Sequence, residues 1–271
     1  MRHVGEIPQL GFGTWQREGV ARFRGVMDAL DIGYRHIDTA EGYNNEEFVG
    51  TALVESGVAR DEIWVTTKVA PESFGPGQVR GHVEASLEKL RLEKVDLLLL
   101  HYPSIGDEYA MEDYIAQFLE VWDAGLTRHL GVSNFTVPYI DRMLGLIGDR
   151  KIFTNQVELH PYLANRTIVD HCRAKDIMLT AYSPLARGRV ADDPVLGEIA
   201  GDHDATPAQV ALAWLMAEGY VVIPSAGSRA RIAETFAAQE LALTETELKR
   251  IAGLDQGMRL VDGPWCPKWD D

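Results

Sequence analysis

The chain has 271 residues, a length that suits one large domain or two ordinary ones. Its 26 basic and 41 acidic residues give a formal net charge of −15, which argues against nucleic acid and anionic membrane surfaces as partners. The composition is 46% hydrophobic and 25% charged, as in globular proteins, and two cysteines exclude a disulfide scaffold. We expect a cytoplasmic protein, because Glu6 and Pro8 interrupt any signal segment and the longest apolar run, 210–217, is too short to span a membrane.

Short apolar runs alternate with amphipathic helices along the chain. Apolar residues at helical spacing predict helices around residues 23–30, 79–90, 115–122, 140–147 and 168–172. Two further helix starts carry capping boxes, Thr206 with Gln209 and Thr244 with Glu247. Between the helices, eight runs predict strands, at residues 10–13, 34–38, 63–67, 95–100, 130–133, 153–159, 177–182 and 221–223.

Eight strand–helix units in a chain of this length predict an α/β fold, a (β/α)₈ TIM barrel formed as a single domain by residues 1–271. Runs such as 97–100 are apolar on both faces, as expected of parallel strands buried on both sides. A doubly wound open sheet is the competing fold. It usually carries three glycines at its first strand–helix turn, and the stretch Leu10-Gly-Phe-Gly-Thr14 has only two.

Polar side chains follow six consecutive predicted strands. In a barrel the carboxyl ends of the strands surround the active site, so these side chains should meet at one rim. They are Asp38, then Thr66-Thr67-Lys68, His101, Ser133-Asn134, Asn155-Gln156 and Tyr182-Ser183.

Four residues of this rim and its loops form a chemically coherent set. Lysine is scarce, with seven lysines against nineteen arginines, yet Lys68 stands at a strand end, where a buried amine has a tunable pKa. Its ammonium would lower the phenol pKa of a nearby tyrosine, while Asp38 would balance its charge. We interpret Tyr43 as a general acid and His101 as a donor to a substrate oxygen. Taken singly, each residue also has an ordinary structural interpretation as a cap, core or surface side chain.

At these residues the chain resembles the aldo-keto reductase family over essentially its whole length. The matching stretches are Gly11-Phe-Gly-Thr-Trp15, Asp38-Thr-Ala-Glu-Gly-Tyr43, Thr66-Thr-Lys68, Leu98-Leu-Leu-His101, Gly131-Val-Ser-Asn-Phe135, Asn155-Gln-Val-Glu-Leu-His-Pro-Tyr162, Ala181-Tyr-Ser-Pro-Leu185 and Val222-Ile-Pro224. Within the family the short chain is most similar to the bacterial 2,5-diketo-D-gluconate reductases of the B type.

The resemblance implies a (β/α)₈ barrel whose base is closed by residues 2–9. It implies reduction of aldehydes and ketones to alcohols by hydride transfer from NAD(P)H, without a metal. Asp38, Tyr43, Lys68 and His101 match the catalytic tetrad of the family. Tyr43 would then protonate the carbonyl oxygen, Lys68 paired with Asp38 would depress the pKa of that tyrosine, and His101 would orient the carbonyl.

The resemblance also implies where the cofactor lies. Ser133, Asn134 and Gln156 would hold the nicotinamide carboxamide, and Tyr182 would stack on the ring. The remaining cofactor residues would be Gly13, Thr14, Asp38, Ser183, Leu185, Ile223, Ser225, Arg231 and Glu234.

The adenosine end of the implied site departs from the family pattern. Ser225 stands where many members have a lysine that contacts the 2′-phosphate, and Thr235 replaces an asparagine. Arg231 matches the phosphate-side arginine, so we expect NADPH, with NADH possible. In an acidic protein the positive charges should gather at the cofactor phosphates, and we expect Arg229, Arg231, Arg187 and Arg189 there.

Aromatic residues are expected at the substrate mouth. We expect Trp15, Tyr43, His101 and Tyr102 there, together with Trp265 and Trp269 from the tail. Tyr102 departs from the family pattern, in which many members have a tryptophan after the histidine. Short loops favour an open pocket for small polar carbonyl compounds such as 2,5-diketo-D-gluconate or methylglyoxal. Glu158 and His160 could suggest a metal pair, but no second ligand cluster accompanies them, so we expect no metal.

Two other functions compete with the reductase. A regulatory subunit of the same fold would keep the cofactor site but would not need all four tetrad residues. A barrel enzyme with a phosphate-bearing substrate would need glycine-rich loops after the seventh and eighth strands, and these are missing. We expect a monomer, because no heptad or large apolar stripe indicates an interface.

Overall fold

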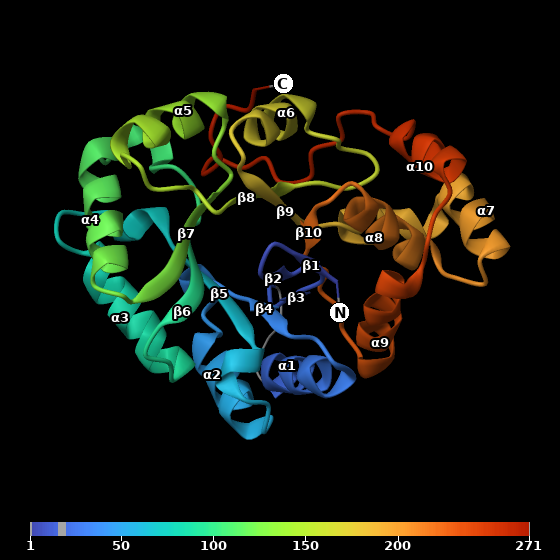
Figure 1. Ribbon diagram of the computed structural model, residues 1–271, viewed down its shortest axis with the longest axis horizontal. Helices are drawn as coiled ribbons and strands as arrows, with labels where there is room; N and C mark the ends of the chain where they lie inside the picture. Colours follow the sequence, from blue (N-terminus) through green and yellow to red (C-terminus); the bar gives the residue numbers. More distant parts are fainter. Residues whose placement is uncertain (1, 16–19, 271) are drawn as a thin grey trace.

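A computed structural model describes residues 2–15 and 20–270 (Figure 1). In this part of the chain eight parallel strands form one sheet, in which they follow one another in chain order. The strands are β3 (Phe12–Gly13), β4 (His36–Asp38), β5 (Trp64–Val69), β6 (Val95–Leu100), β7 (Thr127–Ser133), β8 (Thr154–Glu158), β9 (Met178–Tyr182) and β10 (Val221–Val222). Consecutive order contradicts the doubly wound sheet, in which the strand order reverses.

Backbone hydrogen bonds join the last strand to the first. Val222 N donates to Gln9 O at 2.8 Å, Gly11 N donates to Val222 O at 2.8 Å, and Gly13 N donates to Pro224 O at 2.9 Å. A Cβ atom on Gly13 would lie 2.9 Å from Ile223 O, so glycine permits this close approach. The sheet is therefore TIM-barrel-like, as predicted.

Helices surround the strands, as Figure 1 shows. They are α1 (Val20–Ile32), α2 (Glu46–Glu55), α3 (Val79–Leu90), α4 (Met111–Asp123), α5 (Val137–Leu146), α6 (Arg166–Ala174), α7 (Pro194–Asp202), α8 (Pro207–Ala217), α9 (Arg229–Ala237) and α10 (Glu245–Ala252). The short 3₁₀ turns are η1 (Glu41–Tyr43), η2 (Arg60–Glu62), η3 (Pro71–Ser73), η4 (Ile105–Asp107), η5 (Ala186–Asp192) and η6 (Ala238–Glu240). The predicted capping boxes at Thr206 and Thr244 both form and start α8 and α10.

Every described helix falls short, in length or in apolar character, of what a bilayer crossing requires.

Alternate side chains of β6 enter two different apolar clusters. Leu98 and Leu100 pack in the large cluster that the helices share, whereas Leu97 and Leu99 pack with Trp64 and Val221. Successive strand residues point to opposite faces, so the second cluster is the barrel interior. Ile7 joins it from an antiparallel hairpin of β1 (His3–Val4) and β2 (Ile7–Pro8), which precedes the barrel.

Candidate active site

The carboxyl ends of β4 and β5 bring a buried ion pair together. Lys68 Nζ donates to Asp38 Oδ1 at 2.6 Å and to Thr39 O at 2.7 Å, and both charged side chains are at most 1% exposed. Lys68 Nζ also lies 3.4 Å from the Tyr43 hydroxyl oxygen at the end of η1. The His101 ring, directly after β6, meets the Tyr43 ring edge-on with centroids 5.5 Å apart. The four predicted tetrad residues thus share one site.

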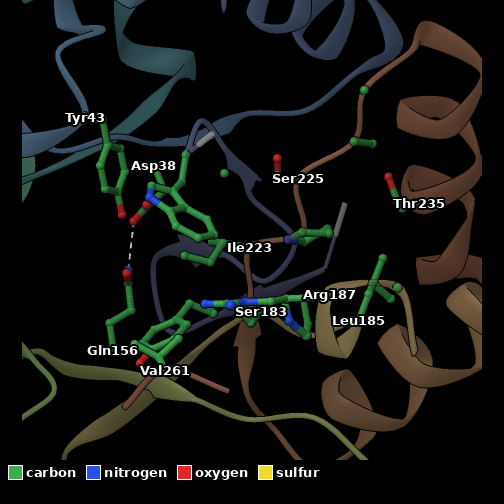
Figure 2. A pocket seen from close by; sticks show the side chains of 18 of the residues that line it. Asp38, Tyr43, Gln156, Ser183, Leu185, Arg187, Ile223, Ser225, Thr235 and Val261 are labelled. Carbon is green, nitrogen blue, oxygen red and sulfur yellow. Dashed lines mark hydrogen bonds between the residues drawn. The ribbon is translucent and has the colours of Figure 1, made fainter. Parts of the chain in front are cut away.

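Gln156 is a further partner of this network. Its Nε2 donates to Asp38 Oδ2 at 2.8 Å, which is the dashed line in Figure 2. Both carboxylate oxygens of Asp38 are therefore hydrogen-bonded, one by Lys68 and one by Gln156. The sequence indicated Gln156 as a strand-end residue but gave no signal for this contact across 118 positions.

The direction of the Tyr43 pKa differs from the prediction. We expected Lys68 to lower it, and that was wrong: burial, followed by the charge of Asp38, raises the pKa of Tyr43 well above its usual value. The Asp38 carboxylate lies 2.6 Å from the ammonium and offsets part of its charge, so the attraction of Lys68 for a phenolate does not outweigh the effect of burial on the pKa of Tyr43. Tyr43 consequently remains a protonated phenol, the form in which it can donate a proton.

Burial also controls the two basic groups of the site. It lowers the pKa of Lys68, against the opposing charge and hydrogen bond of Asp38. Burial and then Lys68 lower the pKa of His101 to about 3. His101 is hence a neutral imidazole at neutral pH, suited to donating a hydrogen bond to an oxygen but not to supplying its proton.

A cavity of about 850 Å³ opens at these residues. In Figure 2 Tyr43, Asp38 and Gln156 lie at one end of it, and Ser225, Leu185 and Thr235 lie toward the other. Its volume falls in the range of small-molecule and cofactor sites. The predicted residues that line it are Gly13, Trp15, Asp38, Tyr43, His101, Tyr102, Ser133, Asn134, Gln156, Tyr182, Ser183, Leu185, Ile223, Ser225, Arg231 and Glu234. Lys68 lies behind Asp38 and does not line the cavity.

Amide and hydroxyl groups gather beside the catalytic end. Asn134 adopts a left-handed φ of 62°, and its Nδ2 donates to His101 O and to Ser133 Oγ, both at 3.0 Å. Its Oδ1 accepts from the Tyr182 hydroxyl at 2.8 Å, and Ser133 Oγ donates to Gln156 O at 2.8 Å. Such a set of fixed donors and acceptors, next to an aromatic ring in an elongated cavity, fits a nicotinamide carboxamide.

Two of the four predicted phosphate-side arginines line the cavity, Arg187 and Arg231. The Arg187 guanidinium lies 5.6 Å from the centroid of the Trp15 ring. Arg229 does not line it: this side chain pairs with Asp28 at 2.9 Å and with Asp31, both on α1, so its charge is used to tie α9 to α1. Arg189 is also absent from the lining, and its place at the phosphates stays a prediction.

Two more predicted residues lie elsewhere. The Thr14 hydroxyl accepts from Asn45 Nδ2 at 3.1 Å, and Thr14 is not part of the lining. Trp269 lies 4.1 Å beneath the Arg259 guanidinium and donates to Asp262 at 3.1 Å, so it belongs to the tail and not to the mouth. Trp265 does line the cavity, as expected.

Several lining residues carry no chemical signal that sequence reasoning could use. They are small or apolar, and include Gly42, Gly188, Val190, Ala191, Ala208 and Val261. Within the described ranges there is no group of three or more histidine, cysteine, aspartate or glutamate side chains that could hold a metal ion.

Comparison with known proteins agrees with the geometry. The sequence model of the Aldo/keto reductase family matches residues 9–256. The chain is 44% identical to methylglyoxal reductase DkgB of Salmonella typhimurium, over 97% of this chain and 99% of that protein. It is 36% identical to methylglyoxal reductase DkgA of Escherichia coli, over 95% and 93% of the two chains.

A solved structure described as a candidate 2,5-diketo-D-gluconic acid reductase B shares 40% identity, with a TM-score of 0.93 over 98% of this chain and 94% of that one. These relatives are named as reductases, which supports carbonyl reduction and not the regulatory alternative. The chain belongs to the aldo/keto reductase family and is an oxidoreductase that acts on small carbonyl compounds with a nicotinamide cofactor.

Proposed function

We propose that the protein reduces small polar α-dicarbonyl compounds or keto sugars, of the methylglyoxal or 2,5-diketo-D-gluconate type, with NADPH as its preferred cofactor. The observation that carries this proposal is the joint placement of Asp38, Lys68, Tyr43 and His101 at one end of the cavity. The names of the relatives support the substrate class.

The bound cofactor supplies the hydride, and the chain supplies the proton and the orientation. Tyr43 is placed to give its phenolic proton to the carbonyl oxygen, because its raised pKa keeps it protonated. Lys68 Nζ, 3.4 Å from that oxygen, stabilises the phenolate as it forms, and Asp38 fixes the ammonium in place. His101, neutral at working pH, donates to the substrate oxygen and sets its direction.

The cofactor would be held along the cavity by groups of different chemistry. Ser133, Asn134 and Gln156 suit the carboxamide, and Tyr182 suits the nicotinamide ring. Glu234 lies at the other end, where its Oε1 accepts from Thr206 at 2.7 Å. Arg187 and Arg231 suit the phosphates and favour NADPH. Ser225 supplies no charge where many family members have lysine, so NADH remains a second cofactor to test.

Contacts of the N-terminal segment support closure of the barrel base. Ile7 is 0% exposed and packs against interior residues of β5 (Trp64), β6 (Leu97 and Leu99) and β10 (Val221). We propose that residues 2–9 close the base and that residues 1–271 act as one domain. The monomeric state and the cytoplasmic location stay predictions.

A substrate panel tests the proposal directly. Consumption of NADPH and of NADH should be followed with methylglyoxal, 2,5-diketo-D-gluconate and aromatic aldehydes, and turnover of none of them would overturn it. Tyr43→Phe should lower kcat by about 10²–10⁴-fold, because the proton donor is lost. NADPH binding, measured by quenching of tryptophan fluorescence, should stay within about twofold of wild type. A fully active Tyr43→Phe variant would show that another group is the acid.

A further inference from the structure

The tail that follows α10 forms part of the cavity wall without having regular structure. Residues 253–270 contain no helix or strand, and none of them is fully buried. Val261 and Trp265 of this segment nevertheless line the cavity, although Trp265 is half exposed. Apolar burial alone is therefore a weak reason for this segment to hold one position, and some other contact must fix it.

That contact is a buried carboxylate at the end of β8. The Glu158 side chain is 0% exposed. Its Oε1 accepts from Leu260 N at 2.9 Å, and its Oε2 accepts from Leu260 N at 3.2 Å and from Val261 N at 2.9 Å. Two consecutive backbone N–H groups of the tail thus point at one carboxylate inside the molecule.

His160 completes the arrangement from the same segment as Glu158. His160 Nδ1 accepts from Tyr162 N at 3.3 Å, so its proton must lie on Nε2, which donates to Glu158 Oε1 at 3.0 Å. This imidazole is consequently a neutral donor in this arrangement. Hydrogen bonds to a carboxylate are about twice as strong as hydrogen bonds between neutral groups.

We propose that Glu158 is a positioning residue for substrate selectivity, acting by clamping the tail so that Val261 and Trp265 form a fixed wall at the substrate end. This inference rests on the proposed function. Because the clamp holds the main chain, the side chain of Val261 remains available to face the cavity, and in Figure 2 Val261 lies at the same end as Gln156 and Tyr43.

Other contacts hold the tail on either side of this clamp. Tyr162 O accepts from Gln256 N at 3.2 Å and from Met258 N at 2.9 Å. Asp270 Oδ2 accepts from Val137 N at 2.8 Å, at the start of α5. Val261 O also accepts from Cys266 Sγ at 3.9 Å, but that contact lies within the tail. The Glu158 clamp bonds Val261 N to the barrel, so it should control the wall more than the flanking contacts do.

The first test is Glu158→Gln, which keeps the shape but replaces one acceptor oxygen by an amide that faces backbone N–H groups. Hydrogen exchange at the Leu260 and Val261 amides should accelerate by about tenfold or more, since hydrogen bonds to a charged acceptor are lost. The ratio of kcat/KM for 2,5-diketo-D-gluconate to that for methylglyoxal should shift by about tenfold, through KM of the larger substrate. The Kd of NADPH should stay within about twofold.

A second variant disrupts the clamp from the tail side, and a third serves as a control. Leu260→Pro removes one clamped N–H while leaving every barrel residue intact, and should reproduce the faster hydrogen exchange at Val261 and the shift in selectivity. Asp270→Asn weakens the contact between Asp270 and Val137 N, and should leave both the exchange at Val261 and the selectivity near wild type.

If Glu158→Gln does not fold, the Leu260→Pro variant tests by itself whether the clamp fixes the tail and sets the selectivity. Unchanged exchange at Val261 together with unchanged selectivity would overturn the clamp. If the wild type reduces neither substrate, the proposed function has failed, and the exchange experiment still tests the clamp by itself.

Discussion

The two ends of the cavity are built differently. At the reacting end Asp38 and Lys68 are buried and each is hydrogen-bonded, and Asp38 is held from two sides. At the other end Ser225 and Arg231 are exposed to solvent. Charges are worth much more where water is excluded, so the barrel fixes the chemistry firmly. The preference for one cofactor then depends on a few side chains in water, each of small effect.

The largest effect is expected from breaking the buried ion pair. Lys68→Met leaves the Asp38 carboxylate without its cation, and the free energy of unfolding should fall by about 3–5 kcal/mol. Urea unfolding measures this change. The double variant Asp38→Asn/Lys68→Met removes both charges and should recover more than half of the loss. Equal losses in the single and double variants would contradict a stabilising role of pairing.

A smaller effect is expected from acid. Burial lowers the pKa of His36 to about 4 and that of His101 to about 3, from an ordinary value of 6.5. Below pH 6.5 these two histidines bind protons in the unfolded chain but stay neutral in the native chain, so the free energy of unfolding falls as pH falls toward 4. Each histidine should contribute on the order of 2 kcal/mol by about pH 4.5.

Unfolding curves at a series of pH values measure this slope. His36→Gln removes one of these titrations and should reduce the slope, while His101 and His129, whose pKa burial also lowers, keep the remainder. An unchanged slope in that variant would assign the acid sensitivity to other groups.

The next effect concerns Asn134, whose Oδ1 already accepts from the Tyr182 hydroxyl. Tyr182→Phe keeps the ring but frees that oxygen for the cofactor carboxamide, so NADPH should bind up to about fivefold more tightly. Fluorescence titration gives the Kd. Tyr102→Phe, which removes a hydroxyl elsewhere on the cavity, is the matched control. Weaker binding by Tyr182→Phe would show that this hydroxyl supports the cofactor directly.

The smallest effect is expected at the exposed end. Ser225→Lys restores the charge that many family members carry there, and an exposed pair contributes about 0.2–1 kcal/mol. Binding of 2′,5′-ADP should therefore tighten by up to about fivefold, while 5′-AMP binding stays unchanged. Calorimetric titration of both nucleotides distinguishes a 2′-phosphate effect from a general gain of charge. Loss of the effect in high salt would be expected of a screened pair, and an equal gain for both nucleotides would argue against the 2′-phosphate.

Sequence patterns predicted the parts of this molecule that depend on neighbours in the chain. Strand ends and helix caps are local, so Asp38, Lys68, His101 and the capping box at Thr206 could be placed in advance. The carboxyl ends of parallel strands meet at one rim, so Asp38, Lys68 and His101 were expected together. Tyr43 lies in the turn η1, and the resemblance to the aldo-keto reductases was needed to imply all four residues as one catalytic set.

Choices between distant partners could not be predicted. Arg229 had acidic residues of α1 as well as phosphates within its possible reach, and only the folded chain shows that it pairs with Asp28 and Asp31. The pKa of Tyr43 depends on how far burial and Asp38 outweigh Lys68, a balance that residue types alone do not fix. The clamp of Glu158 on Leu260 likewise joins residues 102 positions apart.

The hydrogen bonds between Val222 and the segment 9–11 have a consequence for association between chains. An open sheet ends in strands whose unpaired backbone groups can recruit a strand from another molecule, which is a route to aggregation. Here the last strand bonds back to the first, so the eight-stranded sheet presents no such template at that seam. The seam is also short, since β3 and β10 have two residues each. Protection against strand exchange thus rests on a few backbone hydrogen bonds, and local opening there would expose both edges together.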